Sequence, residues 1–484
     1  MSAHGNSLKD TPPRRSFFVN VGALILSRGF VALSQILILP ILARALDVAD
    51  FAVMALAMTV VIFAGTVSDG GFGRSLIRRP DFDRDEWSSV FWLLGGIGLG
   101  LAAIVLAVAP LWAMIFDQPQ LWAVLSVLSV VPLLQAASAA PNADIERRED
   151  YAALARLQVL AATAGMLAAV TLALLGAGIW ALVAQQISLA AIRAAGIAWL
   201  SHFRPSFSFS RAHLSGHLRF ARDTISTSFL GICRTQVTTV AIGKLLGQDA
   251  LGIFAMQQRF ARLPQFGLAG PASAVVFVRM ARVQDDPFHL VRTYLASVRL
   301  LASALLPDLG VVIAAGPVLF PILLSDKWVA VAPVFALAIP GVALEAVTIT
   351  CLVCAFRAVD RTDIQLRLIA EGLAMSMPLT LIATVFGLNA VAASVTVWAL
   401  LFIPRGWHLA REVIPLEPRD ALGAVVPSLV VALAAGVAQV AGTKILSLSP
   451  WTSLAFATAI TVAAYVAIVL LDLRRLRAAI AIFK

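Results

Sequence analysis

Six arginines lie inside long apolar runs of this sequence, where a charged side chain is costly. They are Arg28, Arg193, Arg234, Arg259, Arg262 and Arg299. A guanidinium at the centre of a bilayer costs about 3 kcal/mol on insertion scales, so such a residue normally faces a bundle interior or a watery cavity. Its planar fork of donors matches phosphate in a bidentate manner. Arg193 and Arg299 lie near the ends of their runs, so their side chains can extend to the cytoplasmic surface, and we expect both to be anchors. The other four arginines predict the binding of an anion at membrane depth.

Polar side chains accompany the central arginines at helical spacing. In the run that begins near residue 17, Asn20, Arg28 and Gln35 fall on one side of a helix at about 100° per residue. A second run, 223–245, carries Arg234 on a stripe of threonines. The alternative to a cavity is an interhelical ion pair, which would engage Arg28 and Arg234 structurally.

The stretch QQRFARLPQ supplies a third group of polar residues. Gln257, Gln258, Arg259 and Arg262 lie directly before Pro264. Arg259 and Arg262 are three residues apart and so share a helix face. Together with the two stripes, they form the candidate binding site for an anionic headgroup, with structural pairing again as the alternative.

Three acidic residues lie well inside apolar runs, and all belong to the second half of the chain: Asp308, Glu345 and Glu371. Their depth makes them candidates for carrying a coupling proton or sodium ion. The competing interpretation is that they are structural partners of the embedded arginines. The embedded bases outnumber these acids, so a cavity lined by both sets would repel cations and hold anions.

The composition excludes a soluble protein. Of 484 residues, 60% are hydrophobic and only 13% are charged, whereas globular domains are about half apolar and a quarter charged. The mean hydropathy is +0.90. Most of this chain must therefore be solvated by lipid, and we expect an all-α, polytopic membrane protein.

Apolar runs of about 20 residues predict about 14 transmembrane helices. The spans are expected at 17–43, 50–68, 89–109, 121–140, 154–175, 178–200, 223–245, 250–280, 292–315, 329–356, 363–386, 389–404, 421–440 and 452–472. The resulting division is an N-terminal tail, a first lobe of six spans, a basic linker, a second lobe of six spans, a loop, two further spans and a C-terminal tail. These segments are 1–16, 17–200, 201–222, 223–404, 405–420, 421–472 and 473–484.

The basic residues alternate with these spans. The net charge is +10, and 27 basic residues fall on one side of the membrane against four on the other: Arg44, Lys244, Lys327 and Lys444. The positive-inside rule then places both termini in the cytoplasm. Because the arginines are spread over many loops that set orientation, nucleic acid is not an expected partner.

The two halves of the chain echo each other. LARALDVADFAVM (42–54) resembles AIGKLLGQDALGIF (241–254) at an offset of about 200 residues, and weaker matches follow in the same order. Six spans separate the copies, so the two six-helix repeats should be parallel, with a site between them as in many transporters. Chance similarity between apolar segments is the alternative.

No pattern of an enzyme or a cofactor is found. Cys233, Cys351 and Cys354 lie in apolar runs, where thiols behave as small hydrophobic groups, and no histidines accompany them in a zinc pattern. No phosphate-binding GxxxxGK[ST] motif occurs, which argues against direct ATP use. We expect neither a metal nor another cofactor.

Several longer motifs resemble one family. They are DGGFGRSLIRRPDFDRDEWSSVFWL (69–93), ERREDYAAL (146–154), LLGAGIWALVAQQ (174–186), FRPSFSFS (203–210), IGKLLGQDALGIFAMQQRFARLP (242–264) and SDKWVAVAPVF (325–335). In this order they are similar to the polysaccharide-transporter, Wzx-type branch of the multidrug/oligosaccharidyl-lipid/polysaccharide (MOP) superfamily, over roughly residues 16–410.

The resemblance implies two six-helix lobes around a central cavity, followed by two extra helices. It implies a flippase of the bacterial inner membrane, not an enzyme, that moves an undecaprenyl-pyrophosphate-linked oligosaccharide for exopolysaccharide, capsule or O-antigen synthesis. Cavity arginines of relatives bind the pyrophosphate, and Arg28 fits that pattern. The resemblance also implies glycosyltransferases and a polymerase as partners of a monomeric transporter.

Two other function classes compete with this interpretation. A cation or drug antiporter of the same fold, of the MATE type, would need acidic residues in the cavity, and the first lobe has none at depth. A membrane glycosyl polymerase or ligase would need a large external loop for its chemistry, and every connection on the arginine-poor side is short. A third alternative is a membrane scaffold that transports nothing, and only the embedded polar stripes argue against it.

Overall fold

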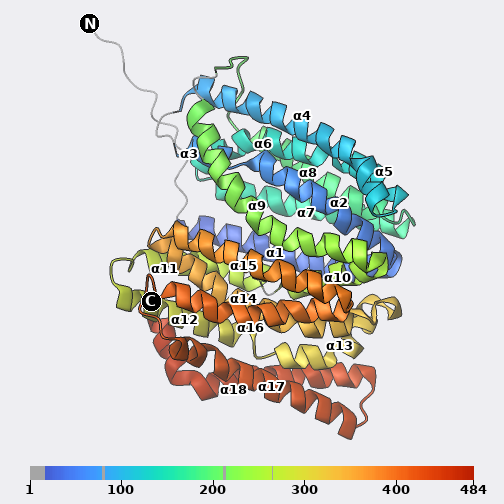
Figure 1. Cartoon of the computed structure of the whole chain (residues 1–484), viewed down its shortest axis with the longest axis vertical. Helices are drawn as coiled ribbons and strands as arrows, with labels where there is room; N and C mark the ends of the chain where they lie inside the picture. Colours follow the sequence, from blue (N-terminus) through green and yellow to red (C-terminus); the bar gives the residue numbers. More distant parts are fainter. Residues whose placement is uncertain (1–16, 79–81, 211–213, 264, 484) are drawn as a thin grey trace.

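Long apolar runs form helices because a backbone in lipid must satisfy its own hydrogen bonds. The computed structural model describes residues 17–78, 82–210, 214–263 and 265–483, and every regular element in these ranges is helical (Figure 1). Several helices begin at a side chain that caps the first turn: Asp83, Asp150 and Asp286 each accept from a backbone N–H two or three residues later.

A first group of helices occupies the upper part of Figure 1, with α1 at its lower edge. Its members are α1 (Phe17–Ala45), α2 (Val48–Asp69), α3 (Phe72–Ile77), α4 (Arg84–Ile115), α5 (Pro119–Leu128), α6 (Val130–Arg147), α7 (Tyr151–Leu174) and α8 (Trp180–Leu200). Gly70 and Gly71 both have positive φ, 46° and 75°, which allows the chain to turn sharply between α2 and α3.

Most of the second group lies below the first in Figure 1, whereas its first helix, α9, begins among the helices of the first group. It consists of α9 (Leu214–Leu245), α10 (Gly247–Ala261), a π-helical turn η2 (Gln265–Ala269), α11 (Gly270–Ala281), α12 (Pro287–Leu305), α13 (Leu309–Leu324), a 3-10 turn η3 (Asp326–Trp328), α14 (Val331–Ala358), α15 (Thr362–Val385) and α16 (Leu388–Ala410). Helix α14 is its centre, since it contacts α10, α11, α12, α13 and α16.

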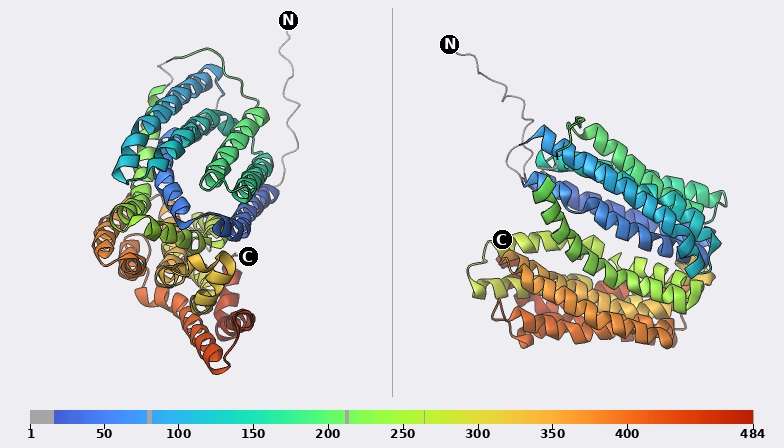
Figure 2. Two further views of the ribbon diagram at one scale, coloured as in Figure 1. Left: turned by 90° about the vertical axis from the view of Figure 1, so that its right-hand side faces the viewer. Right: turned by 45° about the horizontal axis from the view of Figure 1, so that its top comes forward.

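The last two helices, α17 (Pro418–Ile445) and α18 (Pro450–Phe483), pack on α12 and α13 at the edge of the second group (Figure 2). Gly310 of α13 lies directly against Ala432 and Gly436 of α17. Helix α18 is kinked at Asp472, whose carboxylate lies 3.1 Å from Arg299 of α12. The embedded Arg299, expected to reach the membrane surface, therefore has an interhelical partner.

Equivalent helices pack in the same way in the two groups. α1 contacts α7 as α9 contacts α15; α7 contacts α8 as α15 contacts α16; and α6 contacts α8 as α14 contacts α16. This shared neighbour pattern matches the parallel repeat predicted from the offset of about 200 residues.

Eleven helices of the described chain are long and apolar enough to cross a membrane. They account for eleven of the expected spans, and the other three correspond to α1, α9 and the broken helix α10–η2–α11. Some boundaries differ from the expected ones. α16 continues to Ala410 instead of ending near 404, and the chain after 472 is helical to Phe483.

Helix α9 begins at Leu214, inside the segment expected as a linker, for a tertiary reason. His217 is buried; its Nε2 lies 2.8 Å from Glu86 Oε1 of α4 and its Nδ1 lies 2.6 Å from Ser75 Oγ of α3. Leu214 and Ala221 pack in the same cluster as Phe72 and Trp87. The start of α9 is thus held by the first group, while its end contacts α10 and α15 of the second.

Candidate functional site

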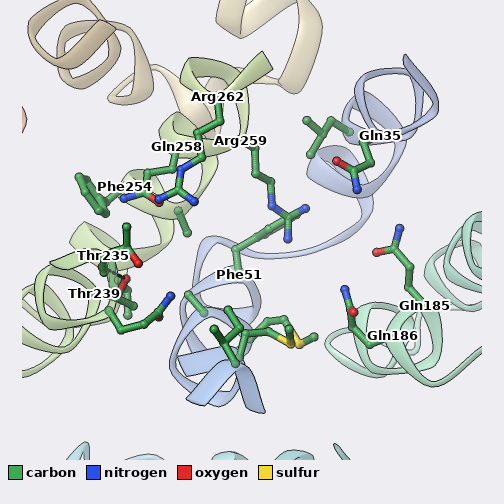
Figure 3. Close-up of a pocket in the computed structure, with 18 of the residues that line it drawn as sticks. Gln35, Phe51, Gln185, Gln186, Thr235, Thr239, Phe254, Gln258, Arg259 and Arg262 are labelled. Carbon is green, nitrogen blue, oxygen red and sulfur yellow. Dashed lines mark hydrogen bonds between the residues drawn. The ribbon is translucent and has the colours of Figure 1, made fainter. Parts of the chain in front are cut away.

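A cavity of about 440 Å³ lies where the two groups meet. It is lined by α1, α2 and α8 from the first group and by α9 and α10 from the second (Figure 3). Such a volume is within the range of small-ligand pockets, about 300 to 1,000 Å³. The described lining residues include two arginines and no carboxylate, so the site is electropositive.

Arg259, near the end of α10, and Arg262, the residue that follows the helix, supply this charge. Neither forms an ion pair or a hydrogen bond with a side chain or backbone group in the part of the chain that the structure describes. The Arg259 guanidinium instead lies over the ring of Phe51 of α2, 5.0 Å from its centroid. Two unpaired cations in one low-dielectric cavity create a binding site for an anion.

Neutral amides line the rest of the polar surface. Gln35, Gln185 and Gln186 reach the cavity from the first group and face Arg259, while Gln258 lies beside Arg262 (Figure 3). None of these four amides hydrogen-bonds to another described residue. Thr235 and Thr239 of α9 lie on the far side of the cavity from Gln185 (Figure 3).

Arg234 is engaged elsewhere. Its Nη2 donates to Glu345 Oε1 of α14 at 2.7 Å, and its guanidinium lies 4.7 Å from the centroid of the Trp398 ring of α16. Both side chains are only partly exposed, at 31% and 21%. The interhelical ion pair, which the sequence left open as the alternative, is the arrangement observed for Arg234 and Glu345.

The other two embedded acids lie away from the described cavity lining. Glu371 accepts from Arg367 at 2.9 Å and from Arg405 at 2.8 Å, next to the arginine-rich end of the second group. Asp308 lies at the junction of α12 and α13, beside Tyr465 of α18. No described carboxylate therefore lines the cavity with Arg259 and Arg262, although the Arg234–Glu345 ion pair lies near enough to Arg262 to interact with it electrostatically.

The remaining predicted residues fall into two cases. Gln257 is buried, 1% exposed, and does not line the cavity; its neighbour Gln258 does. Asn20 and Arg28 belong to α1, but their side chains lie outside the part of the structure that is described. Among the described residues, no group of three or more His, Cys, Asp or Glu side chains could hold a metal ion.

Sequence reasoning did not single out Phe51 or Gln236 for the site. Gln236 accepts a hydrogen bond from the buried Thr59 at 2.9 Å. Phe51 lies in the first turn of an apolar helix, where an aromatic residue is ordinary. The sequence therefore does not indicate that an arginine packs on its ring. Gln185 and Gln186 carried a signal, since they are amides inside an apolar run, but nothing in the sequence placed them opposite Arg259.

The two groups are tied together at the arginine-poor end of the bundle. Trp328 Nε1 donates to the Ala43 carbonyl at 2.8 Å, and Arg44 Nη2 donates to the Ile322 carbonyl at 2.7 Å. Lys327 Nζ donates to the Leu46 carbonyl and lies 3.5 Å from Asp47 Oδ1. These contacts join η3 and α13 to the turn between α1 and α2, on one side of the cavity.

A family model described as polysaccharide biosynthesis protein matches residues 41–333. The chain belongs to this family. It is 27% identical over 319 residues to the succinoglycan biosynthesis transport protein ExoT of Rhizobium meliloti (strain 1021), which is 66% of this chain and 64% of ExoT. It is 22% identical over 303 residues to the lipopolysaccharide biosynthesis protein WzxC of Escherichia coli (strain K12), 61% of each chain. The matched region is thus less than two thirds of the length of either relative.

Solved structures identify the fold of this family member. The lipid II flippase MurJ in an inward closed conformation superposes with a TM-score of 0.75 at 13% identity, over 95% of this chain and 99% of MurJ. An inward-facing multidrug resistance MATE family transporter of the MOP superfamily gives 0.60 at 17% identity, over 81% and 97%. The predicted resemblance to the polysaccharide transporters and the predicted polytopic, all-α fold, which MurJ and the MATE transporter share, are confirmed.

Proposed function

We propose that this member of the polysaccharide biosynthesis family is a flippase that moves a polyprenyl-pyrophosphate-linked oligosaccharide between the leaflets of the bacterial inner membrane. Its family, its fold and its transport relatives support a transporter of polysaccharide precursors. The observation that carries the proposal is the pair of unpaired guanidiniums, Arg259 and Arg262, in a cavity whose described lining has no carboxylate.

The pyrophosphate is the part of the substrate that needs these arginines. A diphosphate offers only acceptor oxygens near neutral pH, and a guanidinium offers only donors, so the two are complementary. The low dielectric of the site strengthens the attraction. The prenyl tail remains in lipid while the headgroup occupies the cavity. Arg28, on α1, stays a predicted third cation of this site.

Alternating access follows from the two-group architecture. By the positive-inside rule, we expect the arginine-rich loops and both termini to lie in the cytoplasm. With that orientation, the contacts of Lys327, Trp328 and Arg44 close the periplasmic side of the cavity. The headgroup enters from the cytoplasmic leaflet, binds to the arginines, and leaves after these contacts separate. Glycosyltransferases and a polymerase are its functional partners at the membrane.

A cation or drug antiporter is the second candidate, because a MATE transporter shares the fold. Such a protein needs an anionic site for its substrate. The embedded acids here are bound to Arg234, Arg367 and Arg405, or lie at the α12–α13 junction. Binding of a cationic dye with an affinity above that for a pyrophosphate lipid would favour this candidate.

Reconstituted transport tests the flippase proposal. The protein is placed in liposomes that contain a polyprenyl-pyrophosphate-linked sugar, and the fraction of headgroups reaching a membrane-impermeant glycosidase is followed over time. Arg259→Gln and Arg262→Gln each remove charge-assisted bonds of about 1.5 to 3 kcal/mol, so we expect headgroup affinity to fall by roughly tenfold or more. Arg193→Gln removes an exposed arginine of α8 outside the cavity and is the matched control. Wild-type rates in both cavity variants, at equal protein levels, would contradict the proposal.

A further inference from the structure

The cavity has two chemically different sides. Arg259 and Arg262 belong to the second group of helices, whereas Gln35, Gln185 and Gln186 belong to the first. Figure 3 shows the three amides gathered on the side opposite to Arg262, with the Arg259 guanidinium between. The amides carry no charge, so they add nothing to the attraction of a diphosphate beyond ordinary dipoles.

These amides are unpaired at membrane depth, which is unfavourable unless a ligand or water satisfies them. Each amide offers two N–H donors and an oxygen with two lone pairs. Gln35, Gln185 and Gln186 make no hydrogen bond with another described residue. Groups that donate and accept at once, closely spaced, are matched by hydroxyl groups, each of which also donates and accepts.

The depths of the two sides follow the order of groups in a lipid-linked sugar. Gln185 and Gln186 lie five and six residues after the start of α8 at Trp180, about 8 Å from the arginine-poor end at 1.5 Å per residue. Arg259 lies twelve residues after the start of α10 at Gly247, about 18 Å from the same end, and Gln35, ten residues before the end of α1 at Ala45, lies about 15 Å from it. A headgroup entering from the arginine-rich end would therefore present its phosphates to Arg259 and its sugar to Gln185 and Gln186, with Gln35 between the two.

The volume of the cavity limits how much of a glycan can bind in it. About 440 Å³ is near the lower end of the range of small-ligand pockets, which is too little for a whole oligosaccharide with its diphosphate. The amides and Arg259 line the same cavity, so the ring that reaches the amides from a diphosphate bound at Arg259 is the one attached to that diphosphate.

We infer that Gln35, Gln185 and Gln186 form a subsite for the first sugar of the substrate, and that this sugar is a neutral hexose or N-acetylhexosamine recognised through its hydroxyl or amide groups. The inference rests on the proposed function. A hexuronic acid at this position would bring a carboxylate close to the negatively charged diphosphate that occupies Arg259, beside amides that carry no charge. We expect it to be bound less tightly than the neutral ring.

Binding to the purified protein in nanodiscs tests the subsite. Three probes are compared: undecaprenyl pyrophosphate, the same lipid carrying one hexose, and the same lipid carrying one hexuronic acid. For the wild type we expect the hexose to tighten binding at least tenfold over the sugar-free lipid. Gln185→Ala and Gln186→Ala should each remove about fivefold of that gain, the value of one neutral hydrogen bond. Gln120→Ala, an amide exposed outside the cavity, is the matched control.

The outcomes separate the two proposals. If the wild type binds the sugar-free lipid but gains nothing from the hexose, or if the glutamine variants weaken all three probes equally, the sugar subsite is wrong and the anion site stands. A hexuronic acid bound more tightly than the hexose would overturn the neutral-sugar inference. If the wild type binds none of the three lipids, the proposed function fails and the subsite with it.

Discussion

The Arg259 guanidinium lies over one side of the Phe51 ring, 5.0 Å from its centroid, and the same ring meets Trp328 edge to face at 5.2 Å. Trp328 donates to the Ala43 carbonyl and follows Lys327, which binds the turn after α1. A cation of the cavity is therefore in contact, through a single aromatic ring, with the contacts that join the two groups at the arginine-poor end.

We expect Phe51 to position Arg259 for the anion. A cation–π contact contributes about 0.5 to 2 kcal/mol, so Phe51→Leu should weaken binding of undecaprenyl pyrophosphate by about two- to tenfold, and Phe51→Tyr should restore it. Phe63→Leu, which removes a ring of the same helix that packs on Phe229 outside the cavity, is the control. Equal affinity in wild type and Phe51→Leu would mean that the ring does not orient the guanidinium.

The ion pair of Arg234 and Glu345 predicts a structural effect, separable from substrate binding. Removing one partner leaves a partly buried charge, so Arg234→Met should destabilise the protein by about 1 to 3 kcal/mol, less than for a fully buried pair. Its melting temperature in detergent should fall accordingly. Arg234→Met/Glu345→Met removes both charges and should recover most of that loss.

Headgroup affinity distinguishes this role from binding. If Arg234 is structural, the double variant should bind the pyrophosphate lipid as the wild type does, because Arg259 and Arg262 remain. A double variant that is stable but has lost headgroup affinity would show that Arg234 also contacts the substrate.

Opening at the arginine-poor end requires the turn after α1 to separate from η3. In a background without Cys233, Cys351 and Cys354, a short reversible cross-linker between Asp47→Cys and Lys327→Cys should stop headgroup transport, and reduction should restore it. The wild-type side chains lie 3.5 Å apart. Undiminished transport in the cross-linked protein would refute separation at this end.

The control for this experiment is a pair inside one group. Arg367 and Glu412, 3.3 Å apart at the arginine-rich end of the second group, should move together. Cross-linking Arg367→Cys to Glu412→Cys is therefore expected to leave transport unaffected.

The sequence predicted the helices well because hydropathy is a local property. Run 329–356 became α14, Val331–Ala358, almost without change. The start of α9 was not predictable in this way, because its first turns are held by contacts of His217 with Ser75 and Glu86, more than 130 residues earlier. The local hydrophobic pattern around His217 contains no information about either partner.

The same limit applies to the site. A polar stripe identified Arg234, Arg259 and Arg262 as facing the bundle interior, but their roles depend on which side chain lies opposite. Glu345, 111 residues away, engages Arg234, whereas the described lining places no acid before Arg259. Gln257 and Gln258 differ by one residue and about 100°, and only the packed structure decides which of them reaches the cavity.

The contact between α13 and α17 depends on the absence of a side chain at Gly310. A Cβ there would lie 1.9 Å from the Ala432 carbonyl oxygen and 3.0 Å from the Gly436 nitrogen. These are backbone atoms of a packed helix, so they cannot move aside without displacing α17. Gly310→Ala should therefore lower the melting temperature, by an amount that corresponds to about 1 to 3 kcal/mol for an overpacked contact.

Gly100→Ala is the matched control, since a Cβ at this exposed position of α4 meets nothing within 4 Å, and alanine there should be neutral or stabilising by up to about 1 kcal/mol. A Gly310→Ala protein as stable as Gly100→Ala would mean that the two helices are not in the close contact seen here.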